Sequence, residues 1–209
     1  MSLPSHPIRV HSFELSGHAH RVRLMLSLLD LPHEVIEVDL PGGAQKRPEF
    51  LARNVFGQVP VIEDGDVTLA DSNAILSYLA LKYDAQARRW LPSAPADHAE
   101  VQRWLSVAAG ALAFGPAAAR ASMLFRSADH PQGRAIAEKL FATMEAHLSS
   151  REWLAADHAT VADVAMYSYT AHAPEGGVSL EPFPRLRAWL ARVEALPRFV
   201  ALPRSATVA

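Results

Sequence analysis

The chain has 209 residues, half of them hydrophobic, which is enough for a substantial core in one large or two small domains. Its formal net charge of -2 excludes the strong positive field that draws nucleic acid. No apolar run approaches the roughly 20 residues of a membrane-spanning helix. Residues 1–7 lack the charged and apolar parts of a signal peptide. We therefore expect a cytoplasmic protein with no nucleic-acid partner and no membrane partner.

The sequence contains no cysteine, which excludes disulfides, thiolate zinc sites and a catalytic protein thiol. Any thiol chemistry must therefore use a thiol that a ligand brings. The ten histidines are scattered, and His18 and His20 have an i, i+2 spacing that places them on different faces of a helix. Because metal sites need clustered ligands, we expect no metal.

The first part of the chain reads as a β-α-β unit. Residues 8–13 alternate between apolar and polar, as a short strand does. Residues 18–29 have apolar side chains at helical spacing, and Pro32 follows the end of that helix. Residues 33–40 alternate again and predict a second strand. Such a unit should have parallel strands and a right-handed crossover.

The next segment reads as a short helix over residues 48–53, followed by a β-hairpin and another helix. We expect strands at 59–63 and 67–69, joined by the turn Asp64-Gly65-Asp66. A helix then begins at Asp71-Ser72 and reaches about Tyr83. The order over residues 1–84 is therefore βαβ, helix, ββα, which is an α/β domain.

Beyond residue 84 the pattern changes to all-helical. Residues 85–96 are rich in turn formers and predict a linker, and residues 97–209 form the second domain. A long helix begins near Asp97, and Pro116 should kink or end it. Further helices are expected at 131–149, after the capping-box sequence that starts at Thr160, and at 183–196.

Val59-Pro60 is the first candidate for a binding element. A proline at the head of a buried strand has no N–H to pair with a neighbouring strand. A cis peptide bond before Pro60 would turn the N–H and C=O of Val59 outward, where they could pair with an extended peptide ligand. An ordinary trans proline at a strand edge is the alternative.

Two helix starts supply further candidates. Asp71 and Ser72 suit a plain helix cap, but their free N–H groups and the helix dipole also suit a ligand carboxylate. Asp71 could take a ligand ammonium, so that the pair would hold an amino-acid zwitterion. Ser16 is either a cap for the first helix or a hydroxyl donor aimed at a thiolate. A free thiol has a pKa of about 8.5, which a nearby helix N-terminus lowers.

Together these segments resemble the cytosolic glutathione transferase family, in its bacterial, serine-type form. The similarity extends over nearly the whole chain. The strongest match is Gly57-Gln58-Val59-Pro60-Val61, followed by Leu69-Ala70-Asp71-Ser72-Asn73-Ala74-Ile75. The junction from Ser16 to Val22, the capping box Thr160-Val161-Ala162-Asp163 and the segment from Pro184 to Leu190 also match.

The resemblance implies a thioredoxin-like N-terminal domain, an all-helical C-terminal domain and a homodimer. It also implies that Pro60 is cis and that the Val59 backbone pairs with the cysteinyl part of glutathione. Asp71 and Ser72 would hold the γ-glutamyl end, with Gln58 nearby. Either Gln45 or Lys46 would hold the glycyl carboxylate.

The chain departs from the family pattern at two positions. Many members have Glu where this chain has Asp71, which keeps the charge but has a shorter reach. The activating position is Tyr or Cys in other branches, and Ser16 is the matching residue here. His18 is the other candidate for contact with the sulfur. It could otherwise be a solvent-exposed helix residue or part of the wall of the second pocket.

The activity that this implies is a glutathione transferase that acts in detoxification. It would activate glutathione as a thiolate for attack on a small hydrophobic electrophile. The second substrate would lie near Phe13, His18 and the long helix around Trp104, Ala108 and Phe114. Two alternatives are a glutathione-dependent disulfide or peroxide reductase without a protein cysteine, and a non-catalytic glutathione-binding module.

Overall fold

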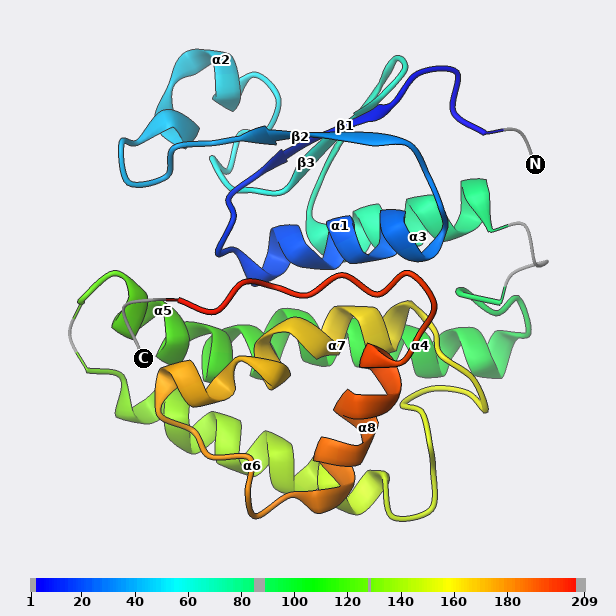
Figure 1. Ribbon diagram of the computed structural model, residues 1–209, viewed down its shortest axis with the longest axis vertical. Helices are drawn as coiled ribbons and strands as arrows, with labels where there is room; N and C mark the ends of the chain where they lie inside the picture. Colours follow the sequence, from blue (N-terminus) through cyan, green and yellow to red (C-terminus); the bar gives the residue numbers. More distant parts are fainter. Residues whose placement is uncertain (1–2, 85–88, 128, 206–209) are drawn as a thin grey trace.

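The computed structural model describes residues 3–84, 89–127 and 129–205 (Figure 1). Part of the expected linker, residues 85–88, lies outside the described residues. The α/β part has the predicted order of elements. These are β1 (Ile8–Ser12), α1 (Gly17–Leu28), β2 (His33–Glu37), η1 (Ala44–Lys46), α2 (Pro48–Leu51), β3 (Val61–Asp64), β4 (Val67–Ala70) and α3 (Ser72–Tyr83).

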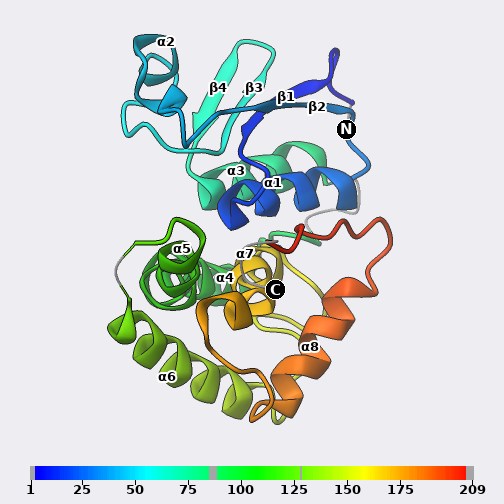
Figure 2. The same ribbon diagram turned by 60° about the vertical axis from the view of Figure 1, so that its left-hand side comes forward.

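The four strands form one mixed sheet in the order β2-β1-β3-β4. β1 and β2 are parallel, which confirms the β-α-β unit, while β3 pairs antiparallel with both β1 and β4. The hairpin pairs Asp64 with Val67, and Gly65 takes a φ of 60° in its tight turn. Helices α1 and α3 cover the face of the sheet that is turned toward the rest of the protein (Figures 1 and 2).

The second part of the described chain is helical, as predicted. Figure 2 shows its helices gathered below the layer formed by α1 and α3. Its elements are α4 (Pro95–Val107), η2 (Ala108–Ala117), α5 (Ala118–Leu124), α6 (Pro131–His147), α7 (Val161–Ala171), η3 (Ala173–Gly176) and α8 (Pro184–Glu194). The fold is therefore a thioredoxin-like domain followed by an all-helical domain.

Of the two predicted outcomes at Pro116, a kink or the end of the long helix, the second is wrong. The helix passes through Pro116 because η2 is a π-helical segment, and α5 continues directly from it. A proline inside an α-helix has no N–H to donate and collides with the carbonyl four residues earlier. The wider turn of a π-helix bonds residues five apart and relieves that collision.

This continuous helix also corrects the expectation about apolar runs. The segment Pro95–Leu124 is long and apolar enough to cross a membrane by length and composition alone. Its inward side chains, however, are those of a core helix, since Val101, Leu105 and Leu112 are buried against the rest of the helical domain.

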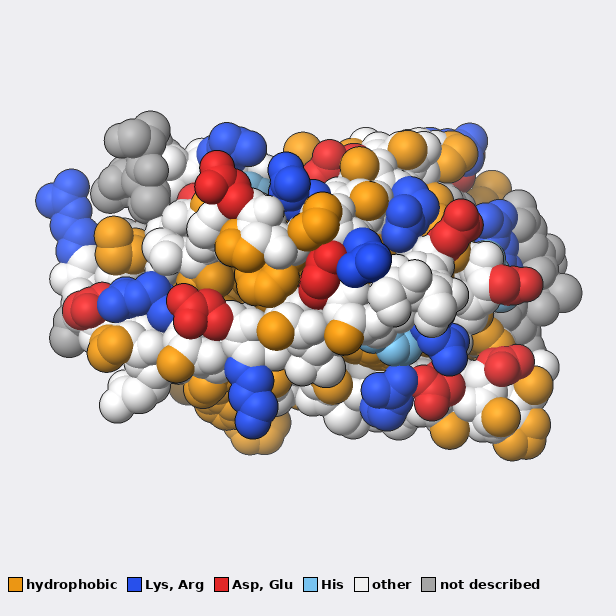
Figure 3. Space-filling view, turned by 90° about the horizontal axis from the view of Figure 1, so that it is seen from below, with side chains coloured by type: hydrophobic (Ala, Val, Ile, Leu, Met, Phe, Trp, Pro, Cys, Tyr) orange, Lys and Arg blue, Asp and Glu red, His pale blue; other side chains and the backbone are white. Residues whose placement is uncertain are grey.

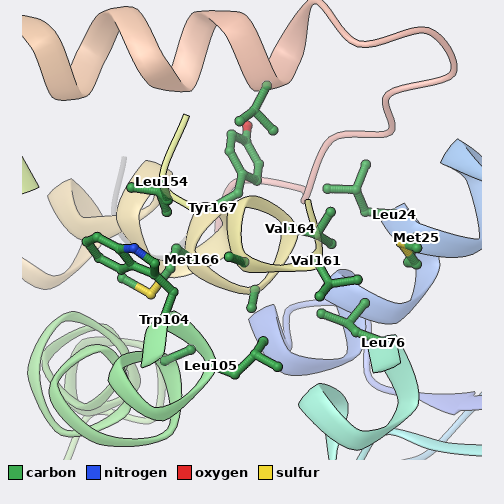
Figure 4. Packing of buried hydrophobic residues seen from close by; sticks show 14 of the residues in the cluster. Leu24, Met25, Leu76, Trp104, Leu105, Leu154, Val161, Val164, Met166 and Tyr167 are labelled. Atoms are coloured by element: carbon green, nitrogen blue, oxygen red, sulfur yellow. The ribbon is translucent and has the colours of Figure 1, made fainter. Parts of the chain in front are cut away.

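Helix α7 is the centre of the main hydrophobic core. It packs against α1 and α3 on one side and against α4 and η2 on another. Figure 4 shows Val161 and Val164 of α7 facing Leu24 of α1 and Leu76 of α3, with Trp104 of α4 beside Met166. The two domains therefore share one continuous core.

The segment after α8 crosses the junction between the domains in an extended form (Figure 1). The buried His20 ring of α1 holds it: Nε2 lies 2.8 Å from the Val200 carbonyl, and Nδ1 lies 2.8 Å from Ser168 Oγ. Ser27 of α1 donates to the Arg198 carbonyl at 2.7 Å. Polar side chains of the first domain thus hold the segment after α8, which belongs to the second domain, in place.

The outer face of the helical domain carries charged side chains of both signs. Figure 3 shows Lys and Arg interspersed with Asp and Glu on this face, which is opposite the sheet. The mixture agrees with the small net charge of the chain.

The capping box at the start of α7 is confirmed. Asp163 is fully buried and accepts hydrogen bonds from the backbone N–H of Thr160 and Leu154 at 2.9 and 3.1 Å. It also accepts from Trp189 Nε1 at 2.9 Å. Burial raises the pKa of this carboxyl. The donors to it come from three segments of the chain, so this one side chain holds the three segments together.

Replacing Asp163 with Ala should leave these buried donors without an acceptor. We expect a loss of about 3 kcal/mol of unfolding free energy, from the missing cap and the unpaired donors. Thermal unfolding should show a midpoint roughly 5–10 °C lower than that of the wild type. Asp157→Ala, which alters an exposed carboxylate, is the matched control. An unchanged midpoint for Asp163→Ala would contradict the role given to this residue.

Candidate functional site

A cavity of about 620 Å³ lies where the loop after β1, the loop before β3 and the start of α3 meet. Three parts of the chain that are far apart in sequence therefore share one wall. The lining residues are Ser16, His18, Leu40, Gln45, Asn54, Phe56, Gly57, Gln58, Val59, Pro60, Ala70, Asp71 and Ser72.

Ser16 stands at the N-terminus of α1. Its N–H donates to the Phe13 carbonyl at 2.9 Å in a tight turn, and its Oγ accepts from the Ala19 N–H at 3.2 Å. The helical domain holds the same turn, because Arg120 donates to the Leu15 carbonyl at 2.7 Å. The prediction that Ser16 caps α1 is confirmed. Ser16 also lines the cavity, so it lies next to any ligand there.

His18 is held as a neutral ring. Its Nδ1 lies 3.1 Å from a guanidinium nitrogen of Arg21. Since arginine can only donate, Nδ1 must be the acceptor, and the proton of the neutral ring is then on Nε2. Burial and the charge of Arg21 lower the pKa of His18 to about 3. The ring therefore presents an N–H donor and no charge at neutral pH.

Arg21 is a buried cation beneath the cavity, with only 1% of its surface exposed. It donates to Ser72 Oγ at 3.1 Å and to Asn73 Oδ1 at 3.4 Å, both at the start of α3. Burial lowers its pKa to about 10, so the side chain stays charged at neutral pH. Arg21 thus connects the start of α1 with the start of α3.

Asp71 caps α3 from an unusual backbone conformation. Its φ is 70°, and one carboxylate oxygen accepts from the Ala74 N–H at 2.9 Å. The residue is exposed and lines the cavity next to Ser72. The cap is confirmed, and contact with a ligand ammonium stays a prediction.

The loop before β3 presents backbone groups to the cavity. The Val59–Pro60 bond is cis, as predicted. Asn54, which is buried, donates to the Gln58 carbonyl at 2.8 Å and accepts from the Phe56 N–H at 3.1 Å, so it holds the loop in shape. No turn or loop hydrogen bond within the described ranges uses the N–H or C=O of Val59.

Most of the predicted site residues meet at this cavity. Eight of them line it: Ser16, His18, Gln45, Gln58, Val59, Pro60, Asp71 and Ser72. Lys46 follows Gln45 in η1 but is not part of the lining. Within the described part of the chain, no group of three metal-ligating side chains comes together.

The expected second pocket needs correction. Trp104 and Ala108 are 2% and 0% exposed, so these core residues cannot contact a substrate. Both belong to the main hydrophobic core, in which Trp104 lies beside Met166 of α7 (Figure 4). Phe13 and Phe114 lie outside the lining of the cavity described above, and their part in a second pocket stays a prediction. Phe13 instead stacks on Phe125 at the end of α5, with ring centroids 6.5 Å apart.

Five lining residues were not predicted from the sequence: Leu40, Asn54, Phe56, Gly57 and Ala70. The Val59-Pro60 motif is preceded in the same loop by Asn54, Phe56 and Gly57. The motif could therefore have been used to predict the whole loop as part of the site. Leu40 lies after β2, and only the fold brings it there. Phe125 follows a helix of the other domain and carries no signal of its own.

Two family models match the chain. The glutathione S-transferase N-terminal domain matches residues 15–82, and the glutathione S-transferase C-terminal domain matches residues 113–197. Glutathione S-transferase 3 of Zea mays is 33% identical over 208 residues, covering 92% of this chain and 91% of that protein. Glutathione S-transferase GstB of Escherichia coli K12 is 30% identical over 190 residues, covering 87% and 90%.

Solved structures agree with these matches. A glutathione S-transferase from Pseudomonas fluorescens superposes with a TM-score of 0.88 at 33% identity, covering 94% of this chain and 99% of that one. A possible glutathione S-transferase from Rhodopseudomonas palustris gives 0.87 at 33% identity, covering 96% and 100%.

The fold and the two matched domains are those of a glutathione-dependent enzyme class. The chain belongs to the glutathione transferase family, and it is a glutathione transferase.

The neutral state of His18 can be measured by NMR of the histidine ring nitrogens. We expect the ring to stay neutral, with its proton on Nε2, down to about pH 4. Arg21→Met should raise the pKa of His18, because it removes the adjacent positive charge. Arg23→Met is the control, since that side chain donates to the Glu14 carbonyl instead. A ring that titrates near pH 6.5 in the wild type would contradict this description.

Proposed function

We propose that the protein binds glutathione in the cavity at the start of α1 and stabilises its thiolate for attack on a small hydrophobic electrophile. One observation carries the proposal: Ser16, Val59 and the start of α3 line the same cavity. A thiol placed at the N-terminus of α1 would be close to a hydroxyl donor and to the positive end of a helix dipole.

The lining residues suit the three parts of glutathione. The Val59 N–H and C=O would pair with the cysteinyl backbone, as an added strand does. Asp71 would accept from the γ-glutamyl ammonium, and Ser72 would donate to its carboxylate, with Gln58 nearby. The charge of Arg21 beneath Ser72 favours an anion there. A glutathione transferase homologue from Drosophila mojavensis, 26% identical with a TM-score of 0.83, was solved with bound glutathione.

Gln45 is the better candidate for the glycyl carboxylate. It lines the cavity. Its side-chain N–H₂ can donate to a carboxylate. Lys46 lies outside the lining.

The chemical step needs only glutathione and the electrophile. The thiol proton leaves to solvent, and the thiolate is held by the Ser16 O–H. The sulfur then uses a lone pair to form a bond to the electrophilic carbon. In a substitution the leaving group departs with its bonding electrons. In an addition to an activated double bond, the resulting carbanion takes a proton from solvent.

The second substrate would lie against the aromatic pair Phe13–Phe125. Phe13 belongs to the tight turn that ends at Ser16, so an electrophile against its ring would lie near a sulfur held by Ser16. Phe125 and the nearby Met123 are exposed apolar side chains on the helical domain. Such a surface suits a small aromatic electrophile. We also propose the homodimer and cytoplasmic location that are typical of the family.

Replacing Ser16 with Ala tests the catalytic proposal. We expect kcat/KM for conjugation of an aryl halide to fall about 10- to 100-fold, because a donor to the thiolate is lost. The pKa of bound glutathione, followed by thiolate absorbance, should rise. Binding of S-methylglutathione should be retained. Ser106→Ala, whose hydroxyl donates to a carbonyl within α4, is the control. An unchanged rate would remove Ser16 from the mechanism.

Phe125→Ala tests the location of the electrophile. The variant loses the aromatic ring that stacks on Phe13, and we expect the KM for an aromatic electrophile to rise about five- to tenfold. The KM for glutathione should not change, because Phe125 is absent from the lining of the glutathione cavity. A small non-aromatic electrophile serves as the control substrate. Equal effects on both KM values would place the electrophile elsewhere.

A further inference from the structure

The His18 ring connects the start of α1 with the start of α3. The backbone N–H of His18 donates to the Tyr169 hydroxyl of α7 at 3.3 Å, which holds the residue in the first turn of α1. Its ring nitrogen Nδ1 lies 3.1 Å from Arg21 Nη1 and 3.5 Å from Ser72 Oγ. The ring therefore extends between the two helix starts that meet at the cavity, and His18 is part of the cavity wall.

The other ring nitrogen, Nε2, is the one that a ligand can reach. Nε2 has no hydrogen-bond partner among the described residues, and it does not belong to their buried polar atoms that lack a partner. It is therefore accessible at the surface of the protein. The part of this wall residue that is open to a ligand thus includes Nε2.

Arg21 makes Nε2 a donor and leaves the ring without a basic nitrogen. A guanidinium has only N–H groups to offer, so Nδ1 accepts from it and the proton of the neutral ring is on Nε2. Nδ1 has a single lone pair, which Arg21 uses. No lone pair remains on the ring to take the proton of a thiol. His18 can therefore donate a hydrogen bond to a ligand, but it cannot act as a general base.

The groups around the ring strengthen this donor. The buried Arg21 is the cation next to it, and Asp71 acts on Arg21 only from a distance. Tyr169 packs edge-on with ring centroids 4.9 Å apart, and burial raises its pKa, so it is neutral. A cation that donates to one ring nitrogen withdraws electron density and makes the N–H on the other a better donor. A hydrogen bond from an N–H to an anion is stronger than one between neutral groups.

We propose that His18 is a second catalytic residue, whose Nε2–H donates a hydrogen bond to the glutathione thiolate alongside Ser16, and that Arg21 is the positioning residue that keeps the ring in this tautomer. Nδ1 is the nitrogen next to Ser72, where the γ-glutamyl carboxylate would lie, so Nε2 would be nearer to the cysteinyl part. The thiol proton leaves to solvent, and the ring neither gains nor loses a proton. This inference rests on the proposed function, because it needs glutathione in the cavity.

Two substitutions at position 18 separate the donor from the packing of the ring. His18→Leu removes the donor, so the pKa of bound glutathione should rise and kcat/KM for an aryl halide at neutral pH should fall about five- to tenfold. His18→Gln keeps an acceptor for Arg21 and an N–H donor, and its kcat/KM should stay within about twofold of the wild type. An unchanged thiol pKa in His18→Leu, or a Gln variant that behaves like the Leu variant, overturns the inference.

His98→Leu is the matched control. His98 also belongs to the first part of a helix, α4, and its ring bonds to the Pro92 carbonyl away from the cavity lining. The thiol pKa should not change in this variant. A rise equal to that in His18→Leu would show a general effect of losing a histidine and would overturn the inference.

S-methylglutathione distinguishes the sulfur from the γ-glutamyl carboxylate as the acceptor of the His18 bond. Its methylated sulfur cannot become a thiolate, so its affinity should be the same in His18→Leu and in the wild type. A loss of this affinity together with an unchanged thiol pKa would place the donor at the carboxylate and overturn the inference.

NMR of the ring nitrogens tests the bond itself and the role of Arg21. Glutathione should move the His18 Nε2 proton to lower field, and S-methylglutathione should not. In Arg21→Met both neutral tautomers of His18 should be present, and the thiol pKa should rise. A ring that stays entirely in the Nε2–H tautomer in Arg21→Met would overturn the role given to Arg21.

Combination with Ser16→Ala separates this inference from the proposed function. If both groups donate to the sulfur, the thiol pKa should be higher in the double variant than in either single variant. A rise with Ser16→Ala but none with His18→Leu overturns this inference and leaves the proposed function. A rise with His18→Leu alone supports this inference and overturns the role of Ser16. If the wild type does not bind glutathione, both are overturned.

Discussion

The contact between the first turn of α1 and helix α7 is the constraint on which the site depends. The ring of Tyr169 approaches so closely that position 17 has no room for a side chain. Two residues before Gly17, the Leu15 carbonyl accepts a hydrogen bond from Arg120 of α5 at 2.7 Å. The helical domain therefore fixes the backbone on both sides of Ser16, and a movement between the domains would also move the site.

Two buried arginines lie at this junction in different electrostatic settings. Arg120 pairs with Glu175 at 2.8 Å, so its charge is compensated. Arg21 has no carboxylate within salt-bridge distance among the described residues and relies on neutral acceptors at the start of α3. A cation beneath a cavity raises the local potential, which suits an anionic ligand.

Much of the fold could be predicted from the sequence, because local patterns carry it. The β-α-β unit, the hairpin at Gly65 and the capping box at Asp163 depend on periodicity and on turn or cap chemistry within a few residues. The same reasoning from local patterns failed at Pro116, where the helix continues. A local rule for α-helices does not foresee that packing against α6 and α7 stabilises a π-helical segment through the proline.

The sequence by itself determined several residues that line the cavity, because they lie at element ends that short motifs mark: Ser16, Val59-Pro60 and Asp71-Ser72. Only the tertiary structure decided that Trp104 is core while Phe125 is exposed, since both are large apolar residues in helical segments. It alone placed the Tyr169 hydroxyl against the backbone N–H of His18, 151 positions earlier in the chain. Contacts between distant segments depend on how helices pack, and helical periodicity records which face of a helix is apolar but not which partner that face meets.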